Sequence, residues 1–364
     1  MYNVKLYNKI SKVGLDDLDA AKYTCSEDFE NYDAVLVRSA KLHDVQFPAD
    51  LKCIARAGAG VNNIPIDRCS QEGIVVFNTP GANANAVKEL VICALLLASR
   101  KVVQGANWVK SLKGTPDIGP AAEKGKSTYA GPEIAGKKLG IIGLGAIGVK
   151  VANAAVALDM EVWGYDPFLS VDGALKLDRS VKHVTELDEI FANCDYITIH
   201  VPLNADTKNT ISAEAIEKMK DGVRIINESR AEIVDDDAML AAIASGRVGK
   251  YVTDFPNEKV VGVDNIIALP HLGACTPESE EKSAVMAARE LYDYLANGNI
   301  KNSVNFPDAT LERMGVSRVC ILHQNVPTML NQFLEITCST GLNVENMINK
   351  AYGAYAYAMI DLNG

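Results

Sequence analysis

Short apolar runs alternate with helical patterns along most of this chain, and turn residues separate them. Four runs within residues 1–100 have the length and composition of strands. The runs that follow residue 138 are apolar throughout, as expected for strands buried on both faces of a parallel sheet. The pattern therefore predicts an α/β protein with parallel sheets. The expected strands are residues 4–7, 34–37, 53–56, 74–78, 139–142, 161–165, 196–201, 223–227, 249–253 and 265–269.

Two long stretches have helical periodicity. Apolar positions recur along residues 84–112, which we expect to form one helix that leaves a first domain and enters a second. Residues 278–297 are amphipathic and are expected to return to the first domain. Between the two, residues 113–131 are rich in Gly, Pro and Lys and are expected to form a loop.

The C-terminal part has a different order of elements. Residues 319–323, 344–350 and 354–362 are expected strands, and residues 329–340 an expected helix. This is most of a βαββαβ module whose last helix and strand do not follow. We expect such a sheet to have an unpaired edge unless a partner chain covers it.

Composition and charge exclude several classes of partner. The net charge is −10, and no Lys/Arg-rich run offers a nucleic-acid surface. No apolar run is long enough to span a bilayer, and the N-terminus does not resemble a signal peptide. Eight scattered cysteines without a C-x-x-C pair indicate mostly buried thiols in a reducing cytoplasm, and the five histidines lack ligand spacing. We therefore expect a cytoplasmic protein with no nucleic-acid, membrane or metal partner.

The most informative motif is the glycine triplet Gly143, Gly145 and Gly148, which stands between an expected strand and an expected helix. In a dinucleotide-binding turn the first glycine allows the tight turn, the second lets backbone N–H groups approach a pyrophosphate, and the third allows close packing. Asp166 ends the next strand, where a carboxylate accepts hydrogen bonds from ribose hydroxyls and repels a 2′-phosphate. The motif predicts NAD rather than NADP as the cofactor.

Later strand ends supply candidate catalytic groups. His271 follows a strand and Pro270, and a histidine there can move the proton that accompanies hydride transfer. Arg230 follows another strand and can hold a keto oxygen and a carboxylate in a forked grip. A carboxylate from residues 253–258 would favour protonated His271 and fix its tautomer. His200, also at a strand end, is expected beside the cofactor.

These segments resemble the D-isomer-specific 2-hydroxyacid dehydrogenases over nearly the whole chain. The resemblance implies two Rossmann-like doubly wound domains and a partial α+β ACT regulatory module at residues 317–364. Residues 1–100 and 273–306 would form a discontinuous substrate-binding domain, and residues 101–272 the NAD-binding domain. The motifs that carry it are residues 37–39, 56–62, 78–89, 143–148, 229–230 and 270–273.

The resemblance also implies roles for individual residues. The catalytic set would be Arg230, Glu258 and His271. The implied cofactor-binding residues are Gly143, Gly145, Ala146, Ile147, Gly148, Asp166, His200, Pro202 and Asp254. The implied substrate-binding residues are Arg38, Ser39, Arg56, Ala59, Gly60, Val61 and Asn83, with the two arginines placed for a 3-phosphate and the others for the carboxylate end.

The function expected from this resemblance is NAD-dependent oxidation of 3-phospho-D-glycerate to 3-phosphohydroxypyruvate, the first step of L-serine biosynthesis. The alternatives are reduction of hydroxypyruvate, glyoxylate or 2-oxoglutarate, and a non-catalytic NAD(H)-sensing scaffold. L-serine is a possible effector, and the family habit of association predicts a homodimer or homotetramer.

Four positions depart from the family pattern. Ala231 replaces a usual glycine and would be strained if its φ is positive. Glu228 could pair with Arg230 or face away from it. Asp254 directly precedes Phe255, whereas the family has an aspartate two residues before the aromatic. Thr328, in a loop that resembles the ACT ligand loop, stands where glycine is common.

Overall fold

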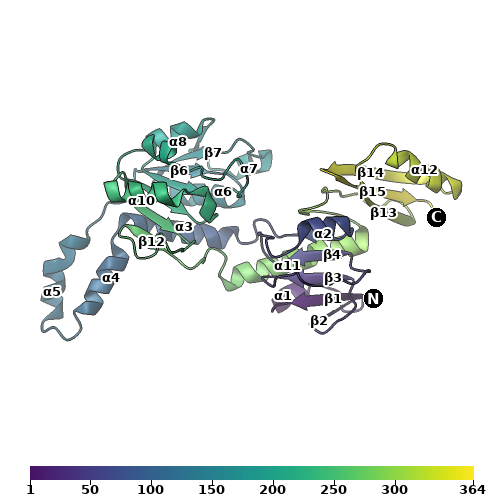
Figure 1. The fold of residues 1–364 in the computed structure, drawn as a ribbon, viewed down its shortest axis with the longest axis horizontal. Helices are drawn as coiled ribbons and strands as arrows, with labels where there is room; N and C mark the ends of the chain where they lie inside the picture. The colour runs from purple at the N-terminus through teal and green to yellow at the C-terminus, as the bar shows by residue number, and fades with distance from the viewer. The chain divides into compact units, whose positions relative to one another are not determined.

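The computed structural model describes residues 1–364, which divide into two compact units (Figure 1). The first unit contains residues 1–83 and 276–364, and the second contains residues 84–275. Each is built around a parallel sheet, so the predicted α/β class is confirmed.

The first unit has a five-stranded parallel sheet with the order β2-β1-β3-β4-β5. This doubly wound order directs the carboxyl ends of all five strands to one edge. The expected strands are confirmed within a few residues, and the additional β2 is a short strand at the sheet edge. The elements are β1 (Tyr2–Tyr7), α1 (Lys12–Leu15), β2 (Tyr23–Ser26), β3 (Ala34–Val37), β4 (Cys53–Arg56), α2 (Ile66–Gln71), β5 (Val75–Phe77) and α11 (Pro277–Asn297).

Helix α11 returns to the first unit as expected. Thr276 caps its start by accepting a hydrogen bond from the Ser279 N–H, and Gly298 ends it in a left-handed conformation. Small residues and one leucine on its inner face are buried in the same core as β3, β4 and β5. This packing places the start of α11 near the carboxyl edge of the sheet, where Glu280 contacts Arg38.

The second unit has a seven-stranded parallel sheet with the order β12-β11-β10-β9-β6-β7-β8. The strand order reverses at β6, which is where ligands bind in folds of this kind. The strands are β6 (Lys138–Ile142), β7 (Glu161–Tyr165), β8 (Lys182–Val184), β9 (Tyr196–Ile199), β10 (Val223–Asn227), β11 (Val248–Thr253) and β12 (Ile266–Ala268). The covering helices are α3 (Ala84–Ser99), α6 (Ala146–Val156), α7 (Val171–Lys176), α8 (Leu187–Asn193), α9 (Ala213–Glu217) and α10 (Asp236–Ser245).

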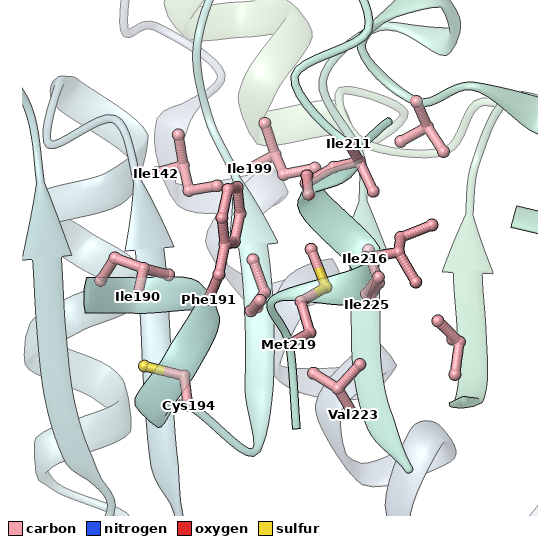
Figure 2. Packing of buried hydrophobic residues seen from close by; sticks show 14 of the residues in the cluster. Ile142, Ile190, Phe191, Cys194, Ile199, Ile211, Ile216, Met219, Val223 and Ile225 are labelled. Atoms are coloured by element: carbon pink, nitrogen blue, oxygen red, sulfur yellow. The ribbon is translucent and has the colours of Figure 1, made fainter. Parts of the chain in front are cut away.

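Alternate side chains of these strands fill two separate cores, one on each face of the sheet. Figure 2 shows the core beneath α8 and α9, where Ile142, Ile199 and Ile225 from three strands gather near Phe191 and Met219. The opposite face packs against α3 and α6. Burial on both faces explains why the strands read as continuous apolar runs.

The single helix expected over residues 84–112 is wrong. Helix α3 ends at Ser99, whose hydroxyl bonds the Leu95 carbonyl and the Tyr196 hydroxyl, and Arg224 donates to the Ala98 carbonyl. These long-range contacts satisfy the helix end. A second helix, α4 (Val102–Ser111), then begins.

The expected loop over residues 113–131 is also wrong in part, because it contains α5 (Ile118–Gly125) and the short 3₁₀ helix η1 (Lys126–Tyr129). Trp108 of α4 stacks on Tyr129 with ring centroids 5.1 Å apart. Gly125 allows this packing, since a Cβ there would lie 2.4 Å from the Trp108 ring. Helices α4 and α5 extend as a pair from the end of α3 (Figure 1). Helix α3 lies in the second unit, which begins at residue 84.

The C-terminal module has the expected elements: β13 (Ser317–Gln324), α12 (Met329–Ser339), β14 (Val344–Tyr352) and β15 (Tyr355–Leu362). They form an antiparallel sheet with the order β13-β15-β14. The module belongs to the first unit, because Tyr357 and Met359 are buried in that unit's core and the Tyr357 hydroxyl donates to the Gly298 carbonyl at 2.6 Å. Thr328 has φ +71°, a conformation that favours glycine.

The expectation of mostly buried cysteines is wrong. Only Cys53, Cys69 and Cys194 are buried, and all eight thiols are free. Cys25, Cys93, Cys320 and Cys338 lie on helix or strand faces that the apolar pattern alone does not orient, and Cys275 lies in a loop. No helix combines the length and apolar character needed to cross a bilayer.

Candidate active site

The glycine triplet forms the turn between β6 and α6. Gly143 has φ +95°, and a Cβ on Gly148 would lie 1.9 Å from the Gly143 carbonyl oxygen, so both positions require glycine. Gly145 has no protein atom within 4 Å of a Cβ. Nothing in the protein demands glycine there, which is the situation expected where a ligand approaches the backbone.

The start of α6 presents unpaired donors. The N–H groups of Gly145, Ala146 and Ile147 form no hydrogen bond within the protein, and no side chain caps the helix. Unpaired N–H groups at the positive end of a helix dipole can bind phosphate oxygens. The residues present therefore fit a dinucleotide pyrophosphate.

Asp166 follows β7 and lies against this turn. Its Oδ2 accepts a hydrogen bond from the Leu144 N–H at 2.8 Å, and its Oδ1 accepts one from the Phe168 N–H at 2.8 Å. Each oxygen keeps a second lone pair for a ribose hydroxyl. Asp166 thus also braces the glycine turn, a role that the sequence did not reveal.

His200 and Pro202 follow β9, beside the glycine turn. The His200 Nε2 lies 3.0 Å from the Thr198 hydroxyl, and its Nδ1 is buried without a hydrogen-bond partner. Burial lowers the His200 pKa to about 3, so the ring is neutral. Pro202 is exposed. A neutral His200 can pack beside a cofactor but carries no charge for catalysis.

Arg230 lies in the loop after β10, and its guanidinium is exposed. The buried Asn227 holds this loop: its side-chain amide donates to the Arg230 carbonyl at 2.9 Å and accepts from the Ser229 N–H at 3.2 Å. Ala231 begins the 3₁₀ helix η2 (Ala231–Ile233) and has no positive φ. The strain expected at Ala231 is therefore absent.

His271 is exposed after β12 and has φ +47°, which is uncommon for a residue other than glycine. Its N–H donates to the Asp254 carbonyl at 2.9 Å and to the Leu269 carbonyl at 3.1 Å. The Phe255 ring centroid lies 4.9 Å from that of His271. Backbone strain of this kind persists where surrounding contacts enforce it, and it is common at functional sites.

Asp254 is hydrogen-bonded to residues 271–273, whereas Glu258, the expected catalytic carboxylate, is not, and its role stays a prediction. Glu258 is exposed, and its side chain forms no hydrogen bond or ion pair. Asp254 is 1% exposed and its Oδ2 accepts the Gly273 N–H at 3.2 Å. Burial raises the Asp254 pKa, while the charges of His271 and Arg230 act in the opposite direction.

Glu228 is buried and does not pair with Arg230. It is 6% exposed, and neither carboxyl oxygen has a hydrogen-bond partner. Burial and the nearby Asp254 raise its pKa to about 9. Of the two orientations considered from the sequence, the structure has the buried one.

In the first unit, Arg38 and Arg56 lie at the carboxyl ends of the adjacent strands β3 and β4. The Arg56 Nε donates to the Arg38 carbonyl at 3.0 Å. The Arg56 guanidinium lies over Gly58, which has φ +151° and where a Cβ would be 2.2 Å from Nη1. Gly58 thus lets this guanidinium lie along the sheet edge.

The loop after Arg56 offers three more donors. The N–H groups of Ala59, Gly60 and Val61 form no hydrogen bond within the protein, while the Ala59 carbonyl accepts from the Asn78 side chain at 2.6 Å. Successive unpaired N–H groups make an anion-binding concavity. Asn83, the last residue of this segment of the unit, is half-buried.

Two residues near this edge were not predicted. Glu280 at the start of α11 forms an ion pair with Arg38, with Nη2 and Oε1 2.6 Å apart. The Asn8 side chain accepts from the N–H groups of Ser39, at 3.0 Å, and Ala40. Ser39 is thereby held beside Arg38. No local sequence signal identifies Glu280, because its partner comes from a distant part of the chain.

Residues 92–273 match the model of the family described as "D-isomer specific 2-hydroxyacid dehydrogenase, NAD binding domain". A D-3-phosphoglycerate dehydrogenase of Archaeoglobus fulgidus is 36% identical over 76% of this chain, and a hydroxypyruvate reductase of Thermotoga maritima is 35% identical over 72% of it. The matches cover 52% of the first protein and 85% of the second. The chain thus spans about half the length of the Archaeoglobus relative.

Among solved structures, the NAD⁺-bound 3-phosphoglycerate dehydrogenase of Entamoeba histolytica superposes with a TM-score of 0.66 and 29% sequence identity. The superposition covers 84% of this chain and 98% of that one.

Proposed function

We propose that this chain, which belongs to the D-isomer-specific 2-hydroxyacid dehydrogenase family, oxidises 3-phospho-D-glycerate with NAD to 3-phosphohydroxypyruvate. This is the entry reaction of L-serine biosynthesis. Family membership confirms the resemblance found in the motifs and confirms NAD as the cofactor. The observation that carries the choice of substrate is the anion-binding edge of the first unit, defined as Arg38, Arg56 and the unpaired N–H groups of residues 59–61.

The second unit supplies the groups for the redox step. When bound, NADH supplies the hydride for the reverse reaction. His271, held in its unusual backbone conformation by Asp254, donates a proton from its ring to the carbonyl oxygen. Arg230 orients the 2-keto acid and stabilises the charge that develops on that oxygen. In the oxidation direction, neutral His271 removes the hydroxyl proton.

The anion-binding edge supplies the groups for a substrate with two acidic ends. A carboxylate needs donors such as the N–H groups of residues 59–61, and a phosphate needs guanidinium groups such as those of Arg38 and Arg56. Curated relatives named D-3-phosphoglycerate dehydrogenase support the phosphorylated acid.

A second candidate is reduction of unphosphorylated hydroxypyruvate. Glu280 favours it, because a carboxylate 2.6 Å from the Arg38 guanidinium repels a phosphate and competes for the cation. The Thermotoga relative bears the name of this activity.

Glu280→Gln separates the two candidates. If Arg38 binds the phosphate, removing the competing charge raises kcat/KM for 3-phosphohydroxypyruvate about fivefold, which corresponds to a like-charge interaction on the order of 1 kcal/mol. The value for hydroxypyruvate stays unchanged. Glu281→Gln, one residue further along α11, is the matched control and should alter neither rate. An equal rise for both acids would exclude a phosphate-specific role for Arg38.

The proposed assembly is a homodimer formed through the α4–α5 pair. Neither helix buries a residue, and Val102, Val103, Val109 and Ile118 are 41–56% exposed. Apolar side chains gathered on a projecting helix pair are typical of an association surface. Val109→Glu should convert the dimer to a monomer in light scattering, while Val171→Glu on α7 should not. A Val109→Glu protein that keeps the wild-type mass would place the interface elsewhere.

L-serine remains the proposed effector, and the C-terminal module is its proposed site. The end of β13 and the loop that follows it carry His323, Gln324 and Asn325, whose polar groups suit an amino acid. Addition of L-serine to the NADH assay tests this directly.

A reaction on soluble phosphorylated acids also supports the proposed cytoplasmic location.

A further inference from the structure

Glu228 and Asp254 are neighbours at the carboxyl edge of the second sheet. They directly follow Asn227 and Thr253, which are paired in the register of β10 and β11. The Asp254 N–H donates to the Asn227 carbonyl at 3.4 Å, so the register continues to these two positions. The two carboxyl groups therefore belong to adjacent strands at the same level.

Both side chains lie on the face of the sheet that packs against α3. Side chains alternate along a strand, so Glu228 shares a face with Ile226, and Asp254 shares a face with Val252. Ile226 and Val252 belong to the core that contains Val87 and other apolar residues of α3. Val87 of α3 lies close to the Asp254 carboxyl, because a Cβ on Gly273 would be 3.4 Å from the Val87 side chain and 3.3 Å from the Asp254 Oδ2.

The two carboxyl groups lack partners for most of their oxygens. Both Glu228 oxygens and the Asp254 Oδ1 are buried and form no hydrogen bond. The charges of His271 and Arg230 act on Asp254 and favour its charged form. Two adjacent buried carboxyl groups cannot both be charged without a large cost, so one of them keeps a proton near neutral pH. Asp254 accepts the Gly273 N–H and feels the charges of His271 and Arg230, which favour its charged form, whereas both Glu228 oxygens lack a partner, so the proton belongs on Glu228, whose pKa is accordingly raised.

We propose that Glu228 is a positioning residue which holds the proton of a Glu228–Asp254 carboxyl pair and leaves Asp254 as the single anion beside Arg230 and His271. Asp254 in turn holds residues 271–273 through its contacts with the His271 and Gly273 N–H groups. The role of Glu228 in catalysis rests on the function proposed above. The protonation of Glu228 and its effect on cofactor binding do not depend on the proposed function.

The pair makes the stability of the apoprotein depend on pH. An unfolded glutamate has a pKa of about 4.3, well below the value of Glu228 in the folded chain. Between these two values folding takes up a proton, so the contribution of Glu228 to stability falls as pH rises and stops falling above about pH 9. Glu228→Gln imitates the protonated acid and removes this dependence.

The test compares wild type with Glu228→Gln in thermal melts of the full chain. We expect the two proteins to have similar melting temperatures at pH 5. As pH rises to 8.5, the melting temperature of Glu228→Gln should become progressively higher than that of wild type. Glu232→Gln, an exposed position in the same segment, is the control and should show no such gap. A lower melting temperature for Glu228→Gln at pH 8.5, or a gap independent of pH, would overturn the proposal.

Titration of NADH by fluorescence tests the positioning role without any substrate. At pH 7.5 the two proteins should bind NADH equally, whereas at pH 10 wild type should bind more weakly and Glu228→Gln should not. If NADH affinity is the same in both proteins at pH 10, the proton on Glu228 has no positioning role. Glu228→Leu, which is also uncharged, must show the same pH-independent stability if the glutamine variant does not fold. If the expected pH-dependent differences in melting temperature and NADH affinity are found but no 2-keto acid is turned over, the proposal about the carboxyl pair stands and only the proposed function is refuted.

Discussion

Replacing His271 with glutamine is expected to lower kcat for 2-keto-acid reduction by roughly two to four orders of magnitude. Glutamine has a similar size and can hydrogen-bond, but it cannot supply a proton at neutral pH. It meets the same backbone strain at φ +47°, so the comparison isolates the ring. The measurement is steady-state oxidation of NADH at saturating acid, together with a fluorescence titration of NADH.

The NADH titration should be nearly unchanged, because His271 lies after β12 and the cofactor phosphates are assigned to the start of α6. His43→Gln, at an exposed position in the first unit, is the control and should keep full activity. Turnover of His271→Gln within about threefold of wild type would remove His271 from the acid/base role, since that loss is far below the usual contribution of such a group.

Asp361→Asn is expected to destabilise the first unit by about 3 kcal/mol or more. Asp361 and Arg318 form a bidentate pair whose side chains are 0% and 4% exposed. Arg318 also donates to the carbonyls of Asn297 and Leu311, so the pair fastens the C-terminal module to the end of α11. The substitution leaves a buried guanidinium without its counter-charge. Urea denaturation followed by tyrosine fluorescence measures the loss.

The same ion pair predicts that the stability of the first unit falls at low pH, along an acid limb of its stability curve. The Arg318 guanidinium lowers the Asp361 pKa to about 2, below the value of about 3.9 in an unfolded chain. Its stabilising contribution is therefore complete above the unfolded value and disappears as pH falls through the folded value. Asp361→Asn should flatten this limb. Asp237→Asn, in an exposed pair with Lys259, should cost less than about 1 kcal/mol. Equal losses in the two variants would contradict the structural role of the buried pair.

The parts of the fold that could be predicted are those determined by local patterns. Strands buried on both faces are apolar along their whole length, so β6, β7, β10 and β11 were located within about a residue. The glycine turn was predicted because backbone geometry restricts Gly143 and Gly148 to glycine.

The errors come from contacts between distant residues. The apolar pattern continues from α3 into α4, and only the contacts of Ser99 and Ala98 with Tyr196 and Arg224 end the first helix. The short edge strand β8 carries charged and polar residues and has no apolar run to identify it. Cysteine burial was overestimated because apolar character does not reveal which face of an element is covered.

In the candidate site, too, residues with a local sequence signal could be proposed, whereas features that depend on distant contacts could not. Arg230 and His271 could be proposed as candidates because each follows a strand that the apolar pattern locates. The Arg38–Glu280 pair and the conformation of His271 depend on long-range packing. The catalytic role of Glu258 was expected from resemblance and stays a prediction, while Asp254 accepts the hydrogen bonds of the His271 and Gly273 N–H groups, a contact that the sequence pattern does not reveal.

The ratio of kcat/KM for 3-phosphohydroxypyruvate to that for hydroxypyruvate, measured from NADH oxidation by wild type, tests the central claim most directly. If Arg38 and Arg56 hold a phosphate in the transition state, the ratio should be at least tenfold in favour of the phosphorylated acid, or about 1.4 kcal/mol. A ratio near one or below it would contradict the assignment to 3-phospho-D-glycerate and favour a reductase of unphosphorylated 2-keto acids.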